Sequence, residues 1–151
     1  MIINNDKTIN HPAIIKFKQA CDNAAAGNPL TINMVQSRDL FKYSKSLMIA
    51  EFDKEQNDFK FRFCGSNIAS NYEMDITGKY ISETTDPSTI KEFIKIYKSI
   101  IDDQKTVYFT GTLQTRGKDF LDWHQISQPL MRNGRINEVI SYVIVEGRVN
   151  D

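Results

Sequence analysis

The order of the predicted elements along the chain constrains the fold most: two strands, a helical middle, then three strands. Between the two sets of strands lies a strongly amphipathic run, and Asp86-Pro87 supplies its N-cap and first-turn proline. We therefore predict a helix over residues 88–102. Because the helices are segregated in the middle instead of alternating with strands, the pattern favours an α+β fold over a doubly wound nucleotide-binding fold.

Five strands are predicted from alternation, strand propensity and turn residues. Phe59, Phe61 and Phe63 alternate with polar residues, so we expect them on one face of a strand. Asn133-Gly134 is the strongest hairpin signal in the chain. The expected strands cover 47–52, 59–64, 107–113, 120–130 and 136–145 and form an antiparallel sheet.

A further helix is expected before the first strand. Ile14, Phe17, Cys21 and Ala24 recur at helical spacing after Pro12, and Gly27-Asn28-Pro29 ends the run. Residues 30–43 show no clean period and are interpreted as connecting structure with a short turn or helix. We expect residues 1–46 to pack with residues 47–147 as one globular unit, since 151 residues with 40% apolar content suit one domain.

Charge and hydropathy exclude several classes of function. The 19 basic residues balance 19 acidic ones, which disfavours generic binding to nucleic acid. No run of apolar residues is long enough to span a bilayer, and the first residues do not resemble a secretory signal. We expect a soluble, cytoplasmic protein without a membrane contact.

The residues that commonly carry chemistry are few and dispersed. Cys21 and Cys64 lack the spacing of redox or zinc motifs and are interpreted as free thiols, and no glycine-rich phosphate loop is present. His11 lies beside Pro12 at a helix entrance, where a surface role is favoured, and His124 lies in a predicted strand. Since these histidines and cysteines are far apart in the sequence, no metal site is expected.

Three short motifs narrow the fold. They are FRFCGSNI at 61–68, DITGK at 75–79 and QPLMRNGRI at 128–136. Their order and spacing resemble those of PAS-like domains of alphaproteobacterial, single-domain type. The resemblance implies a five-stranded antiparallel sheet with a central helical segment and an N-terminal helix. It also implies a sensing or protein-interaction role, with a possible cavity between the sheet and the helices.

The resemblance also bears on cofactors, which remain unknown. Haem-binding PAS domains commonly take an axial histidine from the long helix, and residues 88–102 contain none. Photoactive flavin-binding PAS domains use a cysteine motif in a short helix, whereas Cys64 ends a predicted strand. Haem and cysteinyl-flavin are therefore both disfavoured.

Aromatic residues from the long helix and the strands form a candidate ligand pocket. The candidate residues are Phe61, Phe63, Phe93, Tyr97, Phe109, Trp123 and His124. An ordinary packed core is the competing interpretation. Tyr97 and Trp123 favour the pocket, because a buried polar atom needs a partner that a ligand or water could supply. Gln114, Gln125 and Gln128 could contact a flat heterocycle, but glutamines in a sheet usually face solvent.

Three hypotheses of function follow. The leading one is a non-enzymatic sensory module that binds a small apolar or heterocyclic molecule, or a protein partner, and signals through oligomerisation or a separate effector. The second is an enzyme that uses His124 and Asp122, which are two residues apart and share a strand face. The third is a purely structural dimerisation domain. For dimer or partner contact, the candidate residues are Ile14, Phe17, Cys21 and Ala24.

Overall fold

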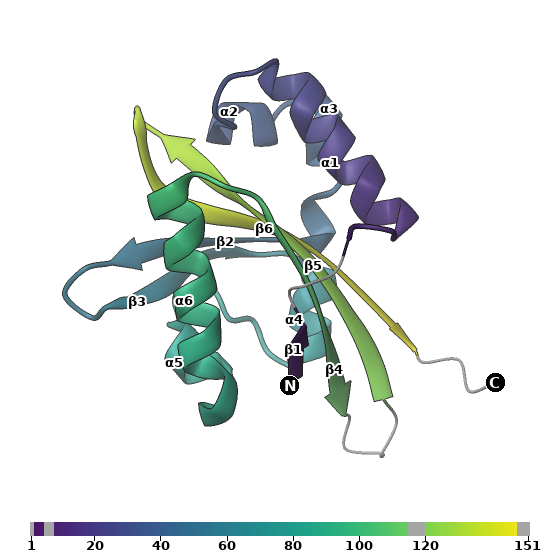
Figure 1. Cartoon of the computed structure of the whole chain (residues 1–151), viewed down its shortest axis with the longest axis vertical. Helices are drawn as coiled ribbons and strands as arrows, with labels where there is room; N and C mark the ends of the chain where they lie inside the picture. The colour runs from purple at the N-terminus through teal and green to yellow at the C-terminus, as the bar shows by residue number, and fades with distance from the viewer. Residues whose placement is uncertain (1, 5–7, 115–119, 148–151) are drawn as a thin grey trace.

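The computed structural model describes residues 2–4, 8–114 and 120–147 (Figure 1). Six antiparallel strands form one sheet in the order β1-β4-β5-β6-β2-β3. The strands are β1 Ile2–Asn4, β2 Leu47–Asp53, β3 Asp58–Cys64, β4 Val107–Gln114, β5 Phe120–Arg132 and β6 Arg135–Gly147. The five predicted strands are confirmed. β1 is an additional three-residue strand, paired to the edge strand β4, that the sequence analysis did not predict.

The helices cover both faces of the sheet. They are α1 Pro12–Ala25, α2 Ile32–Val35, α3 Arg38–Phe41, α4 Ser66–Tyr72, α5 Ile81–Thr84 and α6 Pro87–Asp103, with a 3-10 turn η1 at Ser44–Ser46. Figure 1 shows α6 and α1 on opposite sides of the sheet. We call the side covered by α6 the inner face and the side covered by α1 the outer face. No helix among the described residues is long and apolar enough to cross a membrane.

Each face of the sheet has its own hydrophobic core. The inner core joins α4, α5 and α6 to the sheet, and the outer core joins α1, α2 and α3 to it. Strand alternation divides β5 between them, because Trp123 belongs to the inner core and Ile126 to the outer core. The resulting architecture is α+β, as predicted, with the long helix and the N-terminal helix on either side of one sheet.

A bulge in the β2–β3 pairing corrects one prediction. Ile49 pairs with Phe63 but the next residue, Ala50, pairs with Phe61, so the register shifts between them. One extra residue in a strand moves the following side chain to the other face. Phe61 is accordingly buried on the inner face, whereas Phe63 is 39% exposed and lines a groove on the outer face with Ile49. The expectation that Phe63 shares a face with Phe61 is wrong.

The apolar stripe of α1 packs against the chain's own sheet. Ile14, Phe17 and Cys21 are at most 1% exposed, and Ala24 packs partly buried against the same outer core. Their neighbours there include Tyr142 of β6, whose ring centroid lies 4.6 Å from that of Phe17. The candidate dimer contact through these four residues is therefore corrected to an intramolecular contact. The helix formed where its periodicity predicted it.

Two glycines act in different ways. Asn133 and Gly134 both have positive φ, 52° and 74°, as a type I′ turn requires, and they join β5 to β6 in the hairpin that the sequence predicted. Gly65 has an ordinary φ of −66°, so its role is not a left-handed turn. A Cβ atom at position 65 would lie only 2.3 Å from the carbonyl oxygen of Lys45. Gly65 is needed because two backbone segments touch there.

Candidate ligand site on the inner face

A hydrogen-bonded polar network lies in the middle of the inner core. Gln125 of β5 is its centre: its Oε1 accepts a hydrogen bond from Trp123 Nε1 at 3.0 Å, and its Nε2 donates to the Tyr97 hydroxyl at 2.8 Å. Gln125 Nε2 also lies 2.9 Å from Ser127 Oγ and 3.1 Å from Ser141 Oγ. The network therefore connects α6, β5 and β6.

All five side chains are removed from solvent. Tyr97 and Trp123 are 1% and 2% exposed, and Gln125, Ser127 and Ser141 are fully buried. A buried polar atom is costly without a hydrogen-bond partner, and here each finds partners within the chain. From the sequence, a ligand or water was expected to supply the hydrogen-bond partners of Tyr97 and Trp123. The structure shows that Gln125 and Ser141 supply them.

The network can change its hydrogen bonds without repacking. Gln125 Nε2 has two hydrogens but three hydroxyl oxygens within 3.1 Å. The Ser141 hydroxyl also lies 2.7 Å from Ser127 Oγ and 3.1 Å from the Tyr97 hydroxyl, and in both pairs either oxygen can donate. Rotating these hydroxyls alters which atom donates and which accepts. A bound polar group could therefore be matched by turning O–H bonds alone.

Burial keeps the phenols of this face neutral. The pKa of Tyr97 is raised above its usual value by burial, although hydrogen bonds with Ser141 and Gln125 oppose the shift. Burial also raises the pKa of Tyr72, whose ring meets that of Trp123 edge-on with centroids 6.0 Å apart. At neutral pH both hydroxyls therefore keep their protons. The arrangement suits recognition by hydrogen bonding rather than proton transfer.

Aromatic rings surround the network. Phe93 meets both Tyr97 and Phe109 edge-on, and Phe59 meets Tyr97 edge-on, with ring centroids between 5.4 and 6.2 Å apart. The structure thus brings five of the seven predicted pocket residues into one inner core: Phe61, Phe93, Tyr97, Phe109 and Trp123. These five residues are at most 3% exposed.

The polar half of this site was not predicted from the sequence. Gln125, Ser127 and Ser141 are buried at 0% exposure, so the expectation that sheet glutamines face solvent is wrong for Gln125. It is also wrong for Gln128, which is 6% exposed on the outer side, beside Cys21. The spacing of the residues could have predicted this burial, because residues 123, 125 and 127 share one strand face and Trp123 was expected to be buried. The side chain of Gln114 lies outside the described residues.

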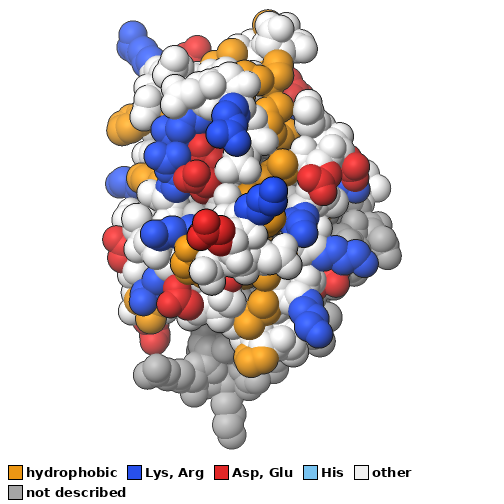
Figure 2. All heavy atoms as spheres, turned by 90° about the vertical axis from the view of Figure 1, so that its left-hand side faces the viewer, with side chains coloured by type: hydrophobic (Ala, Val, Ile, Leu, Met, Phe, Trp, Pro, Cys, Tyr) orange, Lys and Arg blue, Asp and Glu red, His pale blue; other side chains and the backbone are white. Residues whose placement is uncertain are grey.

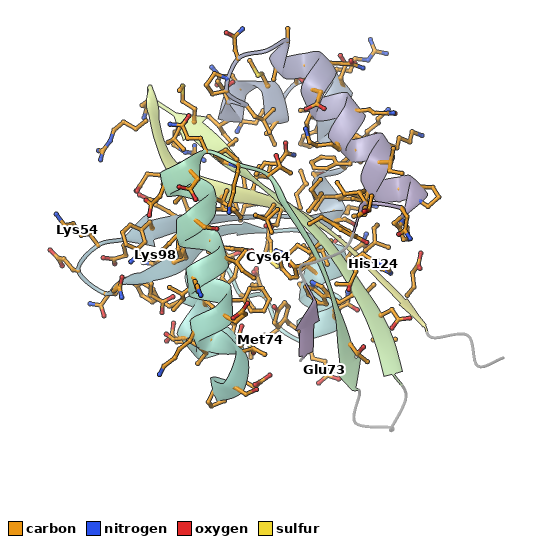
Figure 3. All side chains as sticks on the ribbon, in the orientation of Figure 1. Lys54, Cys64, Glu73, Met74, Lys98 and His124 are labelled. Carbon is orange, nitrogen blue, oxygen red and sulfur yellow. The ribbon has the colours of Figure 1, made fainter. Side chains whose placement is uncertain are left out.

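His124 belongs to the opposite face, so it is corrected out of the inner pocket. Its Nδ1 lies 3.2 Å from the Tyr108 hydroxyl, and Tyr108 is part of the outer core. Figure 3 shows His124 on the sheet near the N-terminal end of α1. Asp122 shares this face by alternation and pairs in register with Glu146. The two residues of the enzyme hypothesis are therefore separated by the sheet from the aromatic site.

Among the surface grooves lined by described residues are three that include neither His124 nor Asp122. One of about 560 Å³ runs along the exposed side of α6, where Figure 2 shows acidic and basic side chains intermingled. One of about 310 Å³ lies between the end of α1 and the β5–β6 hairpin, beside Cys21 and Gln128. The third, of about 330 Å³, lies between α2 and β3 and includes Phe41 and Phe63.

The two cysteines lie apart, since Cys21 belongs to the outer core and Cys64 packs against the inner core. Burial raises the pKa of Cys21 to about 11, and burial also raises the pKa of Cys64 above its usual value. Both thiols are therefore protonated at neutral pH, which makes them poor nucleophiles. Cys64 ends β3 and packs partly buried against the inner core.

Comparison with known proteins identifies the fold. No family model matches the chain, and no curated protein matches it. Among solved structures it is similar to VqmA bound to DPO, with a TM-score of 0.58 and 12% identity over 72% of this chain and 57% of that chain. It is also similar to the Vibrio cholerae VqmA dimer in the absence of target DNA, again with a TM-score of 0.58 and 12% identity, over 72% of this chain and 51% of that one.

A third similar structure is a light-oxygen-voltage domain studied with a flavin analogue. Its TM-score is 0.50 at 6% identity, over 74% of this chain and 86% of that domain. The chain spans only about half the length of the VqmA chains, but most of the light-oxygen-voltage domain. Together with the sheet order and the helix between its two halves, these likenesses show that the chain has a PAS-like fold.

Proposed function

We propose that the chain is a non-enzymatic PAS-like sensory or regulatory module of the alphaproteobacterial, single-domain type, acting in the cytoplasm. Its ligand is a small apolar or heterocyclic molecule bound on the inner face of the sheet. Two likenesses support this proposal: the VqmA structure is of a protein bound to DPO, and the light-oxygen-voltage structure concerns a flavin analogue. The balanced charge of the chain favours a small molecule over nucleic acid.

The observation that carries the proposal is the buried polar network around Gln125. A core that served packing alone would gain more from apolar side chains, because a polar network stabilises only when every member is satisfied. Here an amide, an indole N–H and three hydroxyls meet inside an aromatic shell. An amide with both a donor and an acceptor, bordered by flat rings, suits a planar ligand with polar ring atoms.

Binding would change the attachment of α6 to the sheet. Tyr97 is the member of the network that α6 contributes, and its hydroxyl contacts Gln125 of β5 and Ser141 of β6. Because Gln125 and Tyr97 are buried and hydrogen-bonded to each other, a ligand that binds Gln125 must take over some of these bonds. A ligand shifts a conformational equilibrium by its differential affinity for the two states. Release of Tyr97 from Gln125 would therefore move α6 and alter the surface that a partner contacts.

The signal passes to a separate protein or to a second copy of the chain. We assign residues 1–46 and 47–147 to one unit, supported by the burial of the α1 stripe against the sheet. Since Ile14, Phe17, Cys21 and Ala24 are committed to that contact, a dimer would use other residues. The rival proposal of a purely structural domain predicts that no small molecule binds.

Native mass spectrometry of freshly purified protein tests this function, because it reports a retained small molecule and the oligomeric state together. Trp123 is the sole tryptophan of the chain and donates to Gln125, so its fluorescence reports on the site during titration with heterocycles. We expect a ligand to change this emission. Failure of flavins, pyrazines and indoles to change it, with no retained mass, would leave the structural-domain alternative.

A matched pair of tyrosines provides the control. Tyr97→Phe removes a hydroxyl from the network, whereas Tyr80→Phe removes one that donates to Asp53 away from it. We expect Tyr97→Phe to change ligand affinity by about fivefold to tenfold, which corresponds to one hydrogen bond. Tyr80→Phe should leave affinity unchanged. Equal effects of the two variants would contradict the assignment of the ligand to this network.

A further inference from the structure

The fold brings the only two histidines of the chain together with a carboxylate. His11, the N-cap of α1, and His124 of β5 have ring centroids 4.7 Å apart. His11 Nε2 lies 2.8 Å from Glu146 Oε1, and His124 Nε2 lies 4.0 Å from Glu146 Oε2. The expectation of no metal site rested on the distance between these residues in the sequence, and folding removes that distance.

We propose that His11, His124 and Glu146 form a zinc-binding site on the outer face of the sheet. One ligand atom from each residue can be chosen so that all three lie within 4.8 Å of one another. Tetrahedral zinc with bonds of about 2.0–2.2 Å places neighbouring ligand atoms about 3.3 Å apart. Zinc binding therefore requires the most separated pair of ligand atoms to approach by at most about 1.5 Å, whereas His11 Nε2 and Glu146 Oε1, which are 2.8 Å apart, must separate slightly. Glu146 is about half exposed and can turn to meet them.

The ring nitrogens that do not bind the metal can orient the imidazoles through hydrogen bonds. A metal-bound histidine usually has its second ring nitrogen held by a hydrogen bond. For His124, the hydroxyl of Tyr108 lies 3.2 Å from Nδ1 and can accept a hydrogen bond from a protonated Nδ1, which is the tautomer in which Nε2 carries no proton and can bind the metal. Both histidines are well covered, with side chains 14% and 19% exposed. The site thus combines two positioned imidazoles with one mobile carboxylate.

His11 requires a proton to change place. Its Nδ1 accepts a hydrogen bond from the Ala13 amide at 3.2 Å, so in the neutral ring Nε2 carries the proton and donates it to Glu146. Zinc at Nε2 displaces that proton, the Nδ1 atom becomes the protonated one, and the cap to Ala13 is lost. An N-cap is worth roughly 1 kcal/mol, so this exchange lowers zinc affinity by about fivefold.

Imidazole ligands select zinc over the oxygen-preferring cations. Two nitrogens and one carboxylate suit Zn²⁺, whereas Mg²⁺ requires oxygen ligands. Three protein ligands leave a fourth tetrahedral position for water. The bound ion would connect the beginning of α1 to β5 and to β6, three elements that are distant along the chain.

Nuclear magnetic resonance of the imidazole nitrogens tests the site directly, because the whole chain contains two histidines and both belong to it. Adding one equivalent of ZnCl₂ to the full chain should shift the ring signals of His11 and His124 together and leave both as Nδ1-protonated, Nε2-bound rings. MgCl₂ should shift neither. Zinc that moves neither ring, or only one, would overturn the proposal.

Isothermal titration with ZnCl₂ supplies the second measurement. We expect His11→Asn and Glu146→Gln each to weaken binding by at least about tenfold. Asparagine is also a good N-cap, so His11→Asn removes the ligand while keeping α1 capped. Cys64→Ser is the matched control, since a thiol is the other soft ligand near the surface, and it should bind zinc as the wild type does. Wild-type affinity in both site variants would refute the assignment, and circular dichroism confirms that each variant is folded.

Discussion

Single residues at the centre of the inner face decide whether its core is satisfied. Gln125→Leu would remove the acceptor of the Trp123 N–H and leave that buried donor without its partner. We expect this variant to lose about 1–3 kcal/mol of unfolding free energy. Tyr97→Phe should cost less, about 0.5–1.5 kcal/mol, since Gln125 Nε2 keeps two serine hydroxyls within reach. Urea unfolding followed by Trp123 emission measures both.

The order of these two costs is the informative result. If Tyr97→Phe were the more damaging, the hydroxyl of α6 would be the centre of the network instead of the amide of β5. The double variant Gln125→Leu/Tyr97→Phe provides a further comparison. Because the two residues belong to one hydrogen-bonded network, their losses of unfolding free energy should not add. Tyr80→Phe, outside the network, should add independently to Gln125→Leu.

Gly65 lies in a close backbone contact that cannot be predicted from the sequence. Gly65→Ala would place a Cβ atom 2.3 Å from Lys45 O and 2.4 Å from Ser44 O, and neither carbonyl is a flexible side chain. We expect a loss of about 1–3 kcal/mol, as for other overpacked sites. Ser66→Ala, at the exposed next position, should change the midpoint of urea unfolding little. A neutral Gly65→Ala would show that η1 and β3 can separate at small cost.

At the scale of elements, the β5–β6 hairpin depends on its turn. Gly134 has a φ of 74°, and the neighbouring strands pair along their whole length. Gly134→Ala forces a side chain into the left-handed region and should cost about 1–2 kcal/mol. Gly147→Ala is the matched control, because Gly147 ends β6, has no atom within 4 Å of a new Cβ and has a φ outside the left-handed region. Equal melting temperatures for the two variants would contradict this turn assignment.

Elements were predictable where a single periodicity governs them. The α6 helix follows its amphipathic spacing and begins at its Asp86 cap, and α1 does the same after Pro12. The site was less predictable, because its geometry depends on which strand face meets which helix. The bulge at Phe63 reverses a face that simple alternation predicts, and no local signal announces it. The meeting of His11 with His124 is a consequence of tertiary packing alone.

Periodicity also could not predict the short segments between α1 and β2, which are α2, α3 and η1. Their residues show no period because each helix is only one turn long, so nothing repeats. Local caps hold them, for example the Thr31 hydroxyl that accepts from the Met34 amide. Val35 and Leu40 then close the outer core beside α1. The conformation of such short segments is determined by the surface against which they pack.

At the scale of the whole molecule, acid should destabilise the protein by protonating aspartates that accept hydrogen bonds, namely Asp86 at the N-cap of α6 and Asp53 and Asp75 in turns. The pKa of Asp86 is held below its usual value of 3.8 by the Ser88 hydroxyl, and the pKa values of Asp53 and Asp75 are lowered by Tyr80 and Thr77. A carboxyl whose pKa is lower in the folded state stabilises the fold above the unfolded value. That stability is lost as the pH falls below about 4.

We expect the melting temperature to decline between about pH 5 and pH 2, with the main loss below the unfolded pKa of these aspartates. Asp86→Asn is the informative variant, because asparagine still caps α6 but does not titrate. Its melting temperature should fall less steeply over this range than that of the wild type. A decline as steep as the wild type's would show that Asp86 does not contribute to the acid sensitivity.

The pairing of β2 with β6 also governs how this protein acquires its structure during synthesis. Leu47 pairs with Tyr142 and Glu51 with Glu138, so the β2–β3 hairpin joins the sheet through the last of the six strands. A ribosome exposes β2 and β3 long before β6 leaves the exit tunnel. Until then, the apolar sides of this hairpin and of α1 lack the strand that completes both cores. Nascent chains should thus require shielding until the final hairpin emerges, and then form the sheet in one late step.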